Sequence, residues 1–136
     1  MNAPPDVECL QDAQLFVWRP RGVLDEDKVN KIIAFVTEQE NKYGKPFNRF
    51  TDLSLLDAID LSFKFVFHVA LHRRIARLGQ KAIKSAFLVT TSAVGHYVKL
   101  HALVTDRSPL KVAIFKDRES AAKWLGVSAE LLAPSK

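Results

Sequence analysis

Segments rich in β-forming residues alternate with segments of helical periodicity along this chain, and this alternation restricts the possible folds more than any other feature. Strands are expected at 7–10, 14–19, 46–53, 82–91 and 110–115. Helices are expected at 25–43, 60–78, 92–104 and 117–125. Strands separated by helices of this length need crossover connections, which place them parallel. The sequence therefore predicts an α/β fold with a four- to five-stranded mixed, mostly parallel sheet and about four helices.

Residues suited to helix ends support these boundaries. Asp25, Ser92 and Asp117 stand where a side chain that caps a helix N-terminus is expected. Gly44 and Gly126 stand where the left-handed conformation that ends many helices favours glycine. The first two strands are separated by a short link, so we expect them to pair as a hairpin.

The length of the chain, 136 residues, suits one domain, which we expect to span 1–136 with flexible or short-turn ends at 1–6 and 128–136. Hydrophobic residues make up 48% of the chain, which argues against disorder. Apolar runs stay well short of the roughly 18 residues that span a membrane, and the first residues do not resemble a secretory signal. We therefore expect a cytoplasmic protein that is not transmembrane. Its single cysteine, Cys9, rules out an intramolecular disulfide.

Charge is distributed unevenly along the chain. From Leu61 to Thr105 there is no Asp or Glu, whereas this segment holds seven Lys and Arg residues and all four histidines. Such a segment can form a basic surface for an anionic partner, or a solvated face balanced by acidic residues that the fold brings near. Nucleic acid is the least favoured partner, because the segment has no recognised nucleic-acid motif and no interleaved exposed aromatic residues.

Three segments together carry a resemblance to a known bacterial family. "NRFTDLS" at 48–54 resembles the strand ending in Asp-Leu of STAS-type domains. "AIKSAFLVTTSAVGHYVKLHALV" at 82–104 and "LKVAIFKDRESAAKWLG" at 110–126 resemble the strand–helix pairs that follow in the SpoIIAA-like bacterial family. The resemblance covers roughly 7–126 and implies a compact α/β sandwich related in shape to STAS domains and CRAL-TRIO lipid carriers. It implies no settled activity, because the family is largely uncharacterised and fold alone does not define function.

The regulatory serine of phosphorylated STAS domains has no counterpart at the matching position. In those domains a serine follows an aspartate at the start of the helix after the second core strand. Matching the aspartate to Asp60 places the acceptor position on Leu61, which cannot be phosphorylated, with Ser62 one residue later. We therefore expect Asp60 or Ser62 to cap the following helix and the standard switch to be missing.

The helix expected at 60–78 contains the candidate ligand or partner residues. They are Phe63, Phe65, Phe67, His68, His72, Arg73 and Arg77. One apolar strip is expected to pack on the sheet and a second on a neighbouring element, with a dimer interface or the lining of an apolar ligand site as alternatives. His68 and His72 share a helix face, but the carboxylate or cysteine that would complete a zinc site is not near them in the sequence.

Two functions remain open from the sequence. Nucleophile-elbow, phosphate-loop and metal patterns are missing, so we expect no enzyme, no cofactor and no bound metal. The first hypothesis is a regulatory or protein-interaction module that binds an unknown protein partner or a second copy of itself. The alternative is a carrier or sensor of a small apolar or amphipathic anion, such as a lipid or fatty acid. An internal cavity between the 60–78 helix and the sheet would favour the alternative, and a tightly packed core would count against it.

Overall fold

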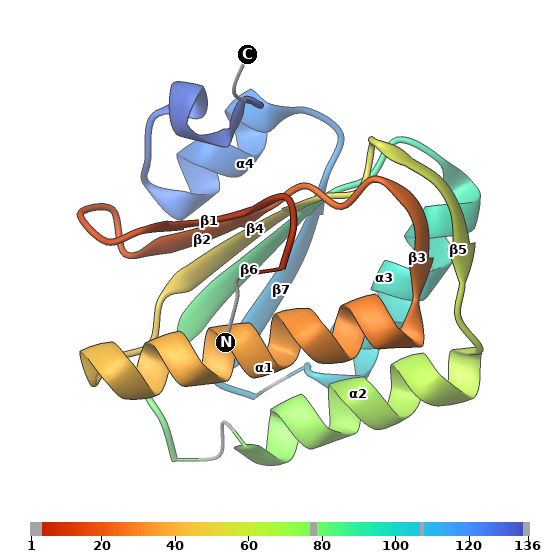
Figure 1. Cartoon of the computed structure of the whole chain (residues 1–136), viewed down its shortest axis with the longest axis horizontal. Coiled ribbons are helices and arrows are strands. Elements are labelled where there is room, and N and C mark those ends of the chain that lie inside the picture. The colour runs from red at the N-terminus through yellow and green to blue at the C-terminus, as the bar shows by residue number, and fades with distance from the viewer. Residues whose placement is uncertain (1–3, 77–78, 107, 135–136) are drawn as a thin grey trace.

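The computed structural model describes residues 4–76, 79–106 and 108–134, which form a five-stranded sheet with helices on both faces (Figure 1). The sheet has the order β1-β2-β4-β6-β7, and only β1 runs antiparallel to its neighbour. Its strands are β1 (Val7–Leu10), β2 (Leu15–Trp18), β4 (Asn48–Asp52), β6 (Ile83–Leu88) and β7 (Leu110–Phe115). The mixed, mostly parallel sheet expected from the sequence is confirmed.

The helices lie in two layers. On one face are α1 (Glu26–Tyr43), α2 (Phe63–Ala76) and α3 (Ser92–Val104); the opposite face carries α4 (Arg118–Leu125) and the short 3-10 helix η1 (Ala129–Leu132) (Figure 1). Each of the three long helices connects a strand to the parallel strand beside it. Right-handed crossovers to successive neighbours place their helices on the same face of a sheet, which accounts for the three-helix layer.

Successive side chains of a strand point to opposite faces of the sheet, so each strand contributes to the cores under both helical layers. Leu15, Val17, Phe50 and Ala86 pack with α4 and η1 in one core cluster. Phe16, between the two β2 residues of that cluster, packs instead against α1. The inner strands β2, β4 and β6 are therefore covered on both sides, as expected for a sheet between two helical layers.

A second, two-stranded sheet was not expected from the sequence. It consists of β3 (Gly22–Asp25) and β5 (Leu56–Asp60), which pair in parallel beside the main sheet (Figure 1). All but the last residue of each strand falls between the strands and helices expected from the sequence. Asp57, Ala58 and Asp60 of β5 are exposed, so the strand lacks the hydrophobic alternation by which half-buried strands are recognised.

Helix boundaries agree with the expected caps, with two corrections. Asp25 accepts a hydrogen bond from the backbone N–H of Lys28, 3.0 Å away, at the start of α1, and Gly44 ends this helix in the left-handed conformation. The N-cap of α3 is Thr91 and not Ser92, which lies one residue inside the helix. α2 begins at Phe63 and not near Asp60, because Asp60 is the last residue of β5.

The segment after α4 is held by a buried arginine at the end of β2. Arg19 is 5% exposed, and its guanidinium donates hydrogen bonds to the carbonyl oxygens of Leu131, Leu132 and Ala133. It also forms a 2.6 Å ion pair with Glu8 of β1. The short turn expected after residue 128 is therefore η1, which Arg19 ties to the first two strands.

Candidate functional site: a cavity under three helices

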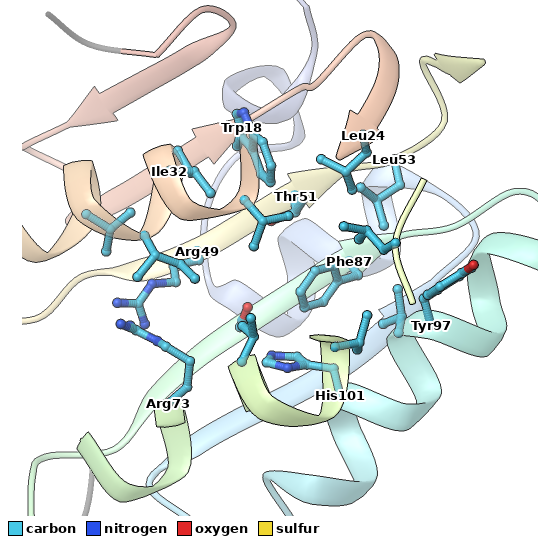
Figure 2. A pocket seen from close by; sticks show the side chains of 18 of the residues that line it. Trp18, Leu24, Ile32, Arg49, Thr51, Leu53, Arg73, Phe87, Tyr97 and His101 are labelled. Carbon is cyan, nitrogen blue, oxygen red and sulfur yellow. The ribbon is translucent and has the colours of Figure 1, made fainter. Parts of the chain in front are cut away.

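A cavity of about 190 Å³ lies between the three-helix layer and the main sheet. α1, α2 and α3 contribute one side of it, and β2, β4 and β6 contribute the other. Figure 2 shows it from close by, with Trp18 and Ile32 at one side and Phe87 and His101 at the other. It exists because the side chains of the helix layer do not fill the space above the strands.

Most of the cavity wall is apolar. Aliphatic and aromatic side chains from every surrounding element line it: Phe16, Trp18, Leu24, Val29, Ile32, Ile33, Val36, Phe50, Leu53, Ile59, Leu61, Phe65, Val66, Val69, Phe87, Tyr97, Val98 and Leu110. Pockets with mainly apolar walls and a few placed polar groups are typical of small-molecule sites. A cavity of about 150 Å³ with Leu, Ile and Phe walls is large enough for benzene. This one is therefore large enough for a ring or short chain that carries a polar group.

One end of the cavity is basic. Arg49 comes from β4 and Arg73 from the last turns of α2, and their guanidinium groups point toward one another in Figure 2. His101 of α3 also lines the cavity, and its ring contacts that of Phe87 at a centroid distance of 5.8 Å. Among the described residues, no carboxylate lines the cavity.

The electrostatics of this end favour an anion. Glu40 of α1 forms a 3.0 Å ion pair with Arg49 from behind the cavity wall, and its other oxygen accepts the backbone N–H of Phe47. This pair offsets one of the two arginine charges. Burial, followed by the nearby Arg73 and Arg49, lowers the pKa of His101 from 6.5 to about 4, so its imidazole is neutral near pH 7. The side chains that line this end are thus two guanidinium groups and a neutral imidazole in an apolar setting, where an anion interacts more strongly than in water.

The structure divides the candidate residues of α2 between two faces. Phe65 and Arg73 line the cavity. Phe63, Phe67, His68 and His72 are exposed on the outer side of the helix. In the outer strip Phe63 contacts Tyr97 of α3, with ring centroids 4.8 Å apart, but Phe63, Phe67 and Leu71 all remain exposed, so this strip is packed less than expected. Arg77 lies outside the described residues.

Two of the three basic cavity residues were not singled out as site residues from the sequence. Arg49 stands in a predicted strand two residues before Thr51, and both line the cavity because alternate residues of β4 share a face. A charged residue at an inward position of a buried strand is a signal for a site, but only once the register of the strand is known. His101 entered the prediction only as one of the four histidines in the segment without Asp or Glu.

The region that matches the STAS phosphorylation site is a helix cap. The backbone N–H of Phe65 donates to the hydroxyl of Ser62 over 3.0 Å, and Ser62 precedes α2 directly. Asp60 belongs to β5, and Leu61 lines the cavity. Of the two expected caps, the structure therefore selects Ser62.

Replacing Ser62 with alanine should lower the free energy of unfolding by about 1 kcal/mol, because the cap of α2 is lost. Ser62→Asp should retain most of the stability, since aspartate caps as well as serine does. Urea unfolding of the three proteins measures both effects. A Ser62→Asp protein that unfolds more easily than Ser62→Ala would show that negative charge at this position disrupts the domain.

Two other site types have little support within the described ranges. There, no group of three His, Cys, Asp or Glu side chains is arranged as metal ligands would be. Nor is any described helix long and apolar enough to cross a membrane. That the protein is not an enzyme stays a prediction.

Comparisons with known proteins identify the fold. No protein-family model matches the sequence, and no curated protein matches it. A similar solved structure is the crystal structure of an uncharacterized protein from the DUF3478 family with a SpoIIAA-like fold, from Shewanella loihica PV-4. The two structures align with a TM-score of 0.57 over 88% of this chain and 90% of that one, at 16% sequence identity. At this identity the likeness concerns the fold alone, and the expected SpoIIAA-like fold is confirmed.

Proposed function

We propose that this SpoIIAA-like domain binds a small amphipathic carboxylate in the cavity, as a carrier or sensor. The observation that supports this most directly is a cavity with apolar walls and one end lined by the guanidinium groups of Arg49 and Arg73 and the neutral imidazole of His101. An apolar chain or ring would lie against the walls from Trp18 to Val69. The carboxylate would lie at the arginines, where bidentate hydrogen bonds from guanidinium groups match its planar shape.

The size of the cavity defines suitable probes. A volume of about 190 Å³ favours a ring with a short acidic side chain or a medium-length acyl chain over a long-chain fatty acid. Octanoate and 3-phenylpropanoate represent these two shapes. Octanol serves as a matched ligand without the charge.

Trp18 supplies an optical signal for binding because it lines the cavity. The other tryptophan, Trp124, packs against Phe115 on the α4 side of the sheet, with ring centroids 5.5 Å apart. A Trp124→Phe background therefore leaves Trp18 as the reporter. Titration with octanoate should change its fluorescence saturably, and native mass spectrometry of freshly purified protein should show whether a ligand is retained.

Replacing Arg73 with glutamine should weaken octanoate binding by about 10- to 100-fold and leave octanol binding nearly unchanged. The reason is that a hydrogen bond to a charged group contributes about 1.5–3 kcal/mol, and each 1.4 kcal/mol is a factor of ten in affinity. Arg73 is preferred to Arg49 for this test, since removing Arg49 would leave the mostly buried Glu40 without its ion pair. Fluorescence titration of Trp18 measures the change.

Lys64→Gln is the matched control, because it removes one positive charge from the exposed side of the same helix. Its octanoate affinity should equal that of the wild type. A second variant, Val69→Phe, fills the cavity from the α2 wall and should abolish binding of both octanoate and octanol. Equal affinity in the wild type, Arg73→Gln and Val69→Phe would place the ligand elsewhere and contradict the proposal.

The regulatory or protein-interaction module remains the competing hypothesis. The fold is compatible with it, but fold alone does not assign a function. The cavity favours the carrier, since a module that acts only through its surface needs no hollow interior.

A further inference from the structure

The outer face of α2 carries an apolar row that stays partly uncovered, although the ring of Phe63 also contacts that of Tyr97 on α3 at a centroid distance of 4.8 Å. Phe63, Phe67 and Leu71 are 54%, 43% and 38% exposed, and they follow one another at intervals of four residues. Residues four apart on a helix lie one above the other, so these three side chains form a continuous strip. Burying large apolar side chains is favourable by about 1.5–3 kcal/mol each, which makes an uncovered row of three a candidate contact surface.

A second row runs beside the first, one residue further round the helix. It consists of Lys64, His68 and His72, all of them exposed. Lys99 and His96 are also exposed, on the neighbouring helix α3. Because the chain has no acidic residue from Leu61 to Thr105, neither α2 nor α3 contributes a negative charge to this surface.

We propose that this outer face of α2 docks on an anionic lipid surface, with the Phe63–Phe67–Leu71 row in the interfacial layer and the Lys64 row at the lipid headgroups. Helices that lie in a membrane interface combine these two features, an apolar row and a neighbouring basic row. Basic side chains near an anionic leaflet add attraction that salt weakens. A second copy of the chain fits less well, since two such faces would bring like charges together.

Docking would place the cavity next to the lipid. The inner face of α2 supplies Phe65, Val66, Val69 and Arg73 to the cavity wall, so one helix separates the cavity from the docked surface. An amphipathic acid that partitions into the membrane would then have a short path to the site. This last step rests on the proposed function, whereas docking itself rests only on the exposed face.

Co-sedimentation with vesicles tests the docking. The full chain should bind vesicles with 30% phosphatidylglycerol in phosphatidylcholine at least about tenfold more tightly than pure phosphatidylcholine vesicles, and the difference should shrink as salt rises. The double variant Phe63→Ser, Phe67→Ser should lose at least about tenfold in affinity, and Lys64→Gln should lose less. Leu131→Ser is the matched control, since Leu131 is an exposed apolar residue on the opposite side of the sheet, with the same exposed fraction as Leu71, 38%.

Each outcome supports or overturns the proposal. Binding that the double variant loses and Leu131→Ser retains supports it. No binding at low salt, or equal binding by the double variant, overturns it. Light scattering after size-exclusion chromatography tests whether a second copy of the chain binds the row instead. A dimeric wild type and a monomeric double variant would show that the row is an interface between two copies and would overturn the proposal. Octanoate titration without vesicles tests ligand binding in the cavity separately from docking on lipid, because either proposal can fail while the other holds.

Discussion

Replacing Arg19 with methionine should lower the free energy of unfolding by about 3–5 kcal/mol, one of the two largest effects we expect in this protein. Methionine retains much of the length of the side chain but donates no hydrogen bond. The carbonyl oxygens of Leu131, Leu132 and Ala133 would lose their Arg19 donors in a region where Leu132 is fully buried. Either the carbonyls stay buried without partners, or η1 detaches and exposes the core beneath it. Urea unfolding measures the loss.

Arg21→Met is the matched control for Arg19→Met. Arg21 lies two residues later, is 60% exposed at its side chain, and reaches Asp6 only at 4.0 Å. An exposed ion pair of this kind contributes little, so the variant should lie within about 0.5 kcal/mol of the wild type. Amide hydrogen exchange should show faster exchange in Ala129–Leu132 for Arg19→Met alone. Similar stability of both variants would show that η1 does not depend on Arg19.

The main sheet could be predicted from the sequence because its signals are local. β6 and β7 are short apolar runs, and helices of crossover length separate them. Capping residues in the sequence indicated most helix ends, as Asp25 and Gly44 did for α1. β3 and β5 lacked such signals because their pairing depends on contacts across the fold. Leu24 is buried only once β3 lies beside Leu53 and Val98.

The candidate site was predictable only in part, because a cavity is a property of packing. Phe65 and Arg73 were identified as candidate ligand residues on the 60–78 helix, and both line the cavity. Whether a side chain of α2 faces inward depends on which side of the helix meets the sheet, and the apolar residues Phe63 and Phe65 point in different directions. Arg49 and His101 come from other elements. Nothing in the local sequence shows that they converge with Arg73.

His101 makes the free energy of unfolding depend on pH, because its pKa differs between the folded and the unfolded protein. Burial and the neighbouring Arg73 and Arg49 lower its pKa from 6.5 to about 4, so the folded protein resists protonation there. Among the described residues that line the cavity none is a carboxylate: Glu40 pairs with Arg49, and the neighbouring lining residues Ser85 and Leu110 of β6 and β7 carry no charge. The unfolded chain has no such environment, and its histidine takes up a proton near pH 6.5.

The sign of the effect follows from this difference. Below pH 6.5 the unfolded state binds more protons than the folded state, so the free energy of unfolding falls as the pH falls. The loss continues to about pH 4, where the folded state also becomes protonated. The difference between the pKa of His101 in the unfolded state, 6.5, and in the folded state, about 4, lowers the free energy of unfolding by about 3 kcal/mol, since one pKa unit is worth 1.36 kcal/mol.

The wild type should therefore lose about 3 kcal/mol more than His101→Gln between pH 6.5 and 4. Glutamine is neutral throughout this range, and subtracting the two curves removes what the carboxylates common to both proteins contribute. His96→Gln, at an exposed position of the same helix, should follow the wild-type curve. Urea unfolding at half-unit pH steps measures all three. If the wild-type and His101→Gln curves run parallel, His101 is not held neutral by the two arginines, and the basic end of the cavity is more open to water than its geometry implies.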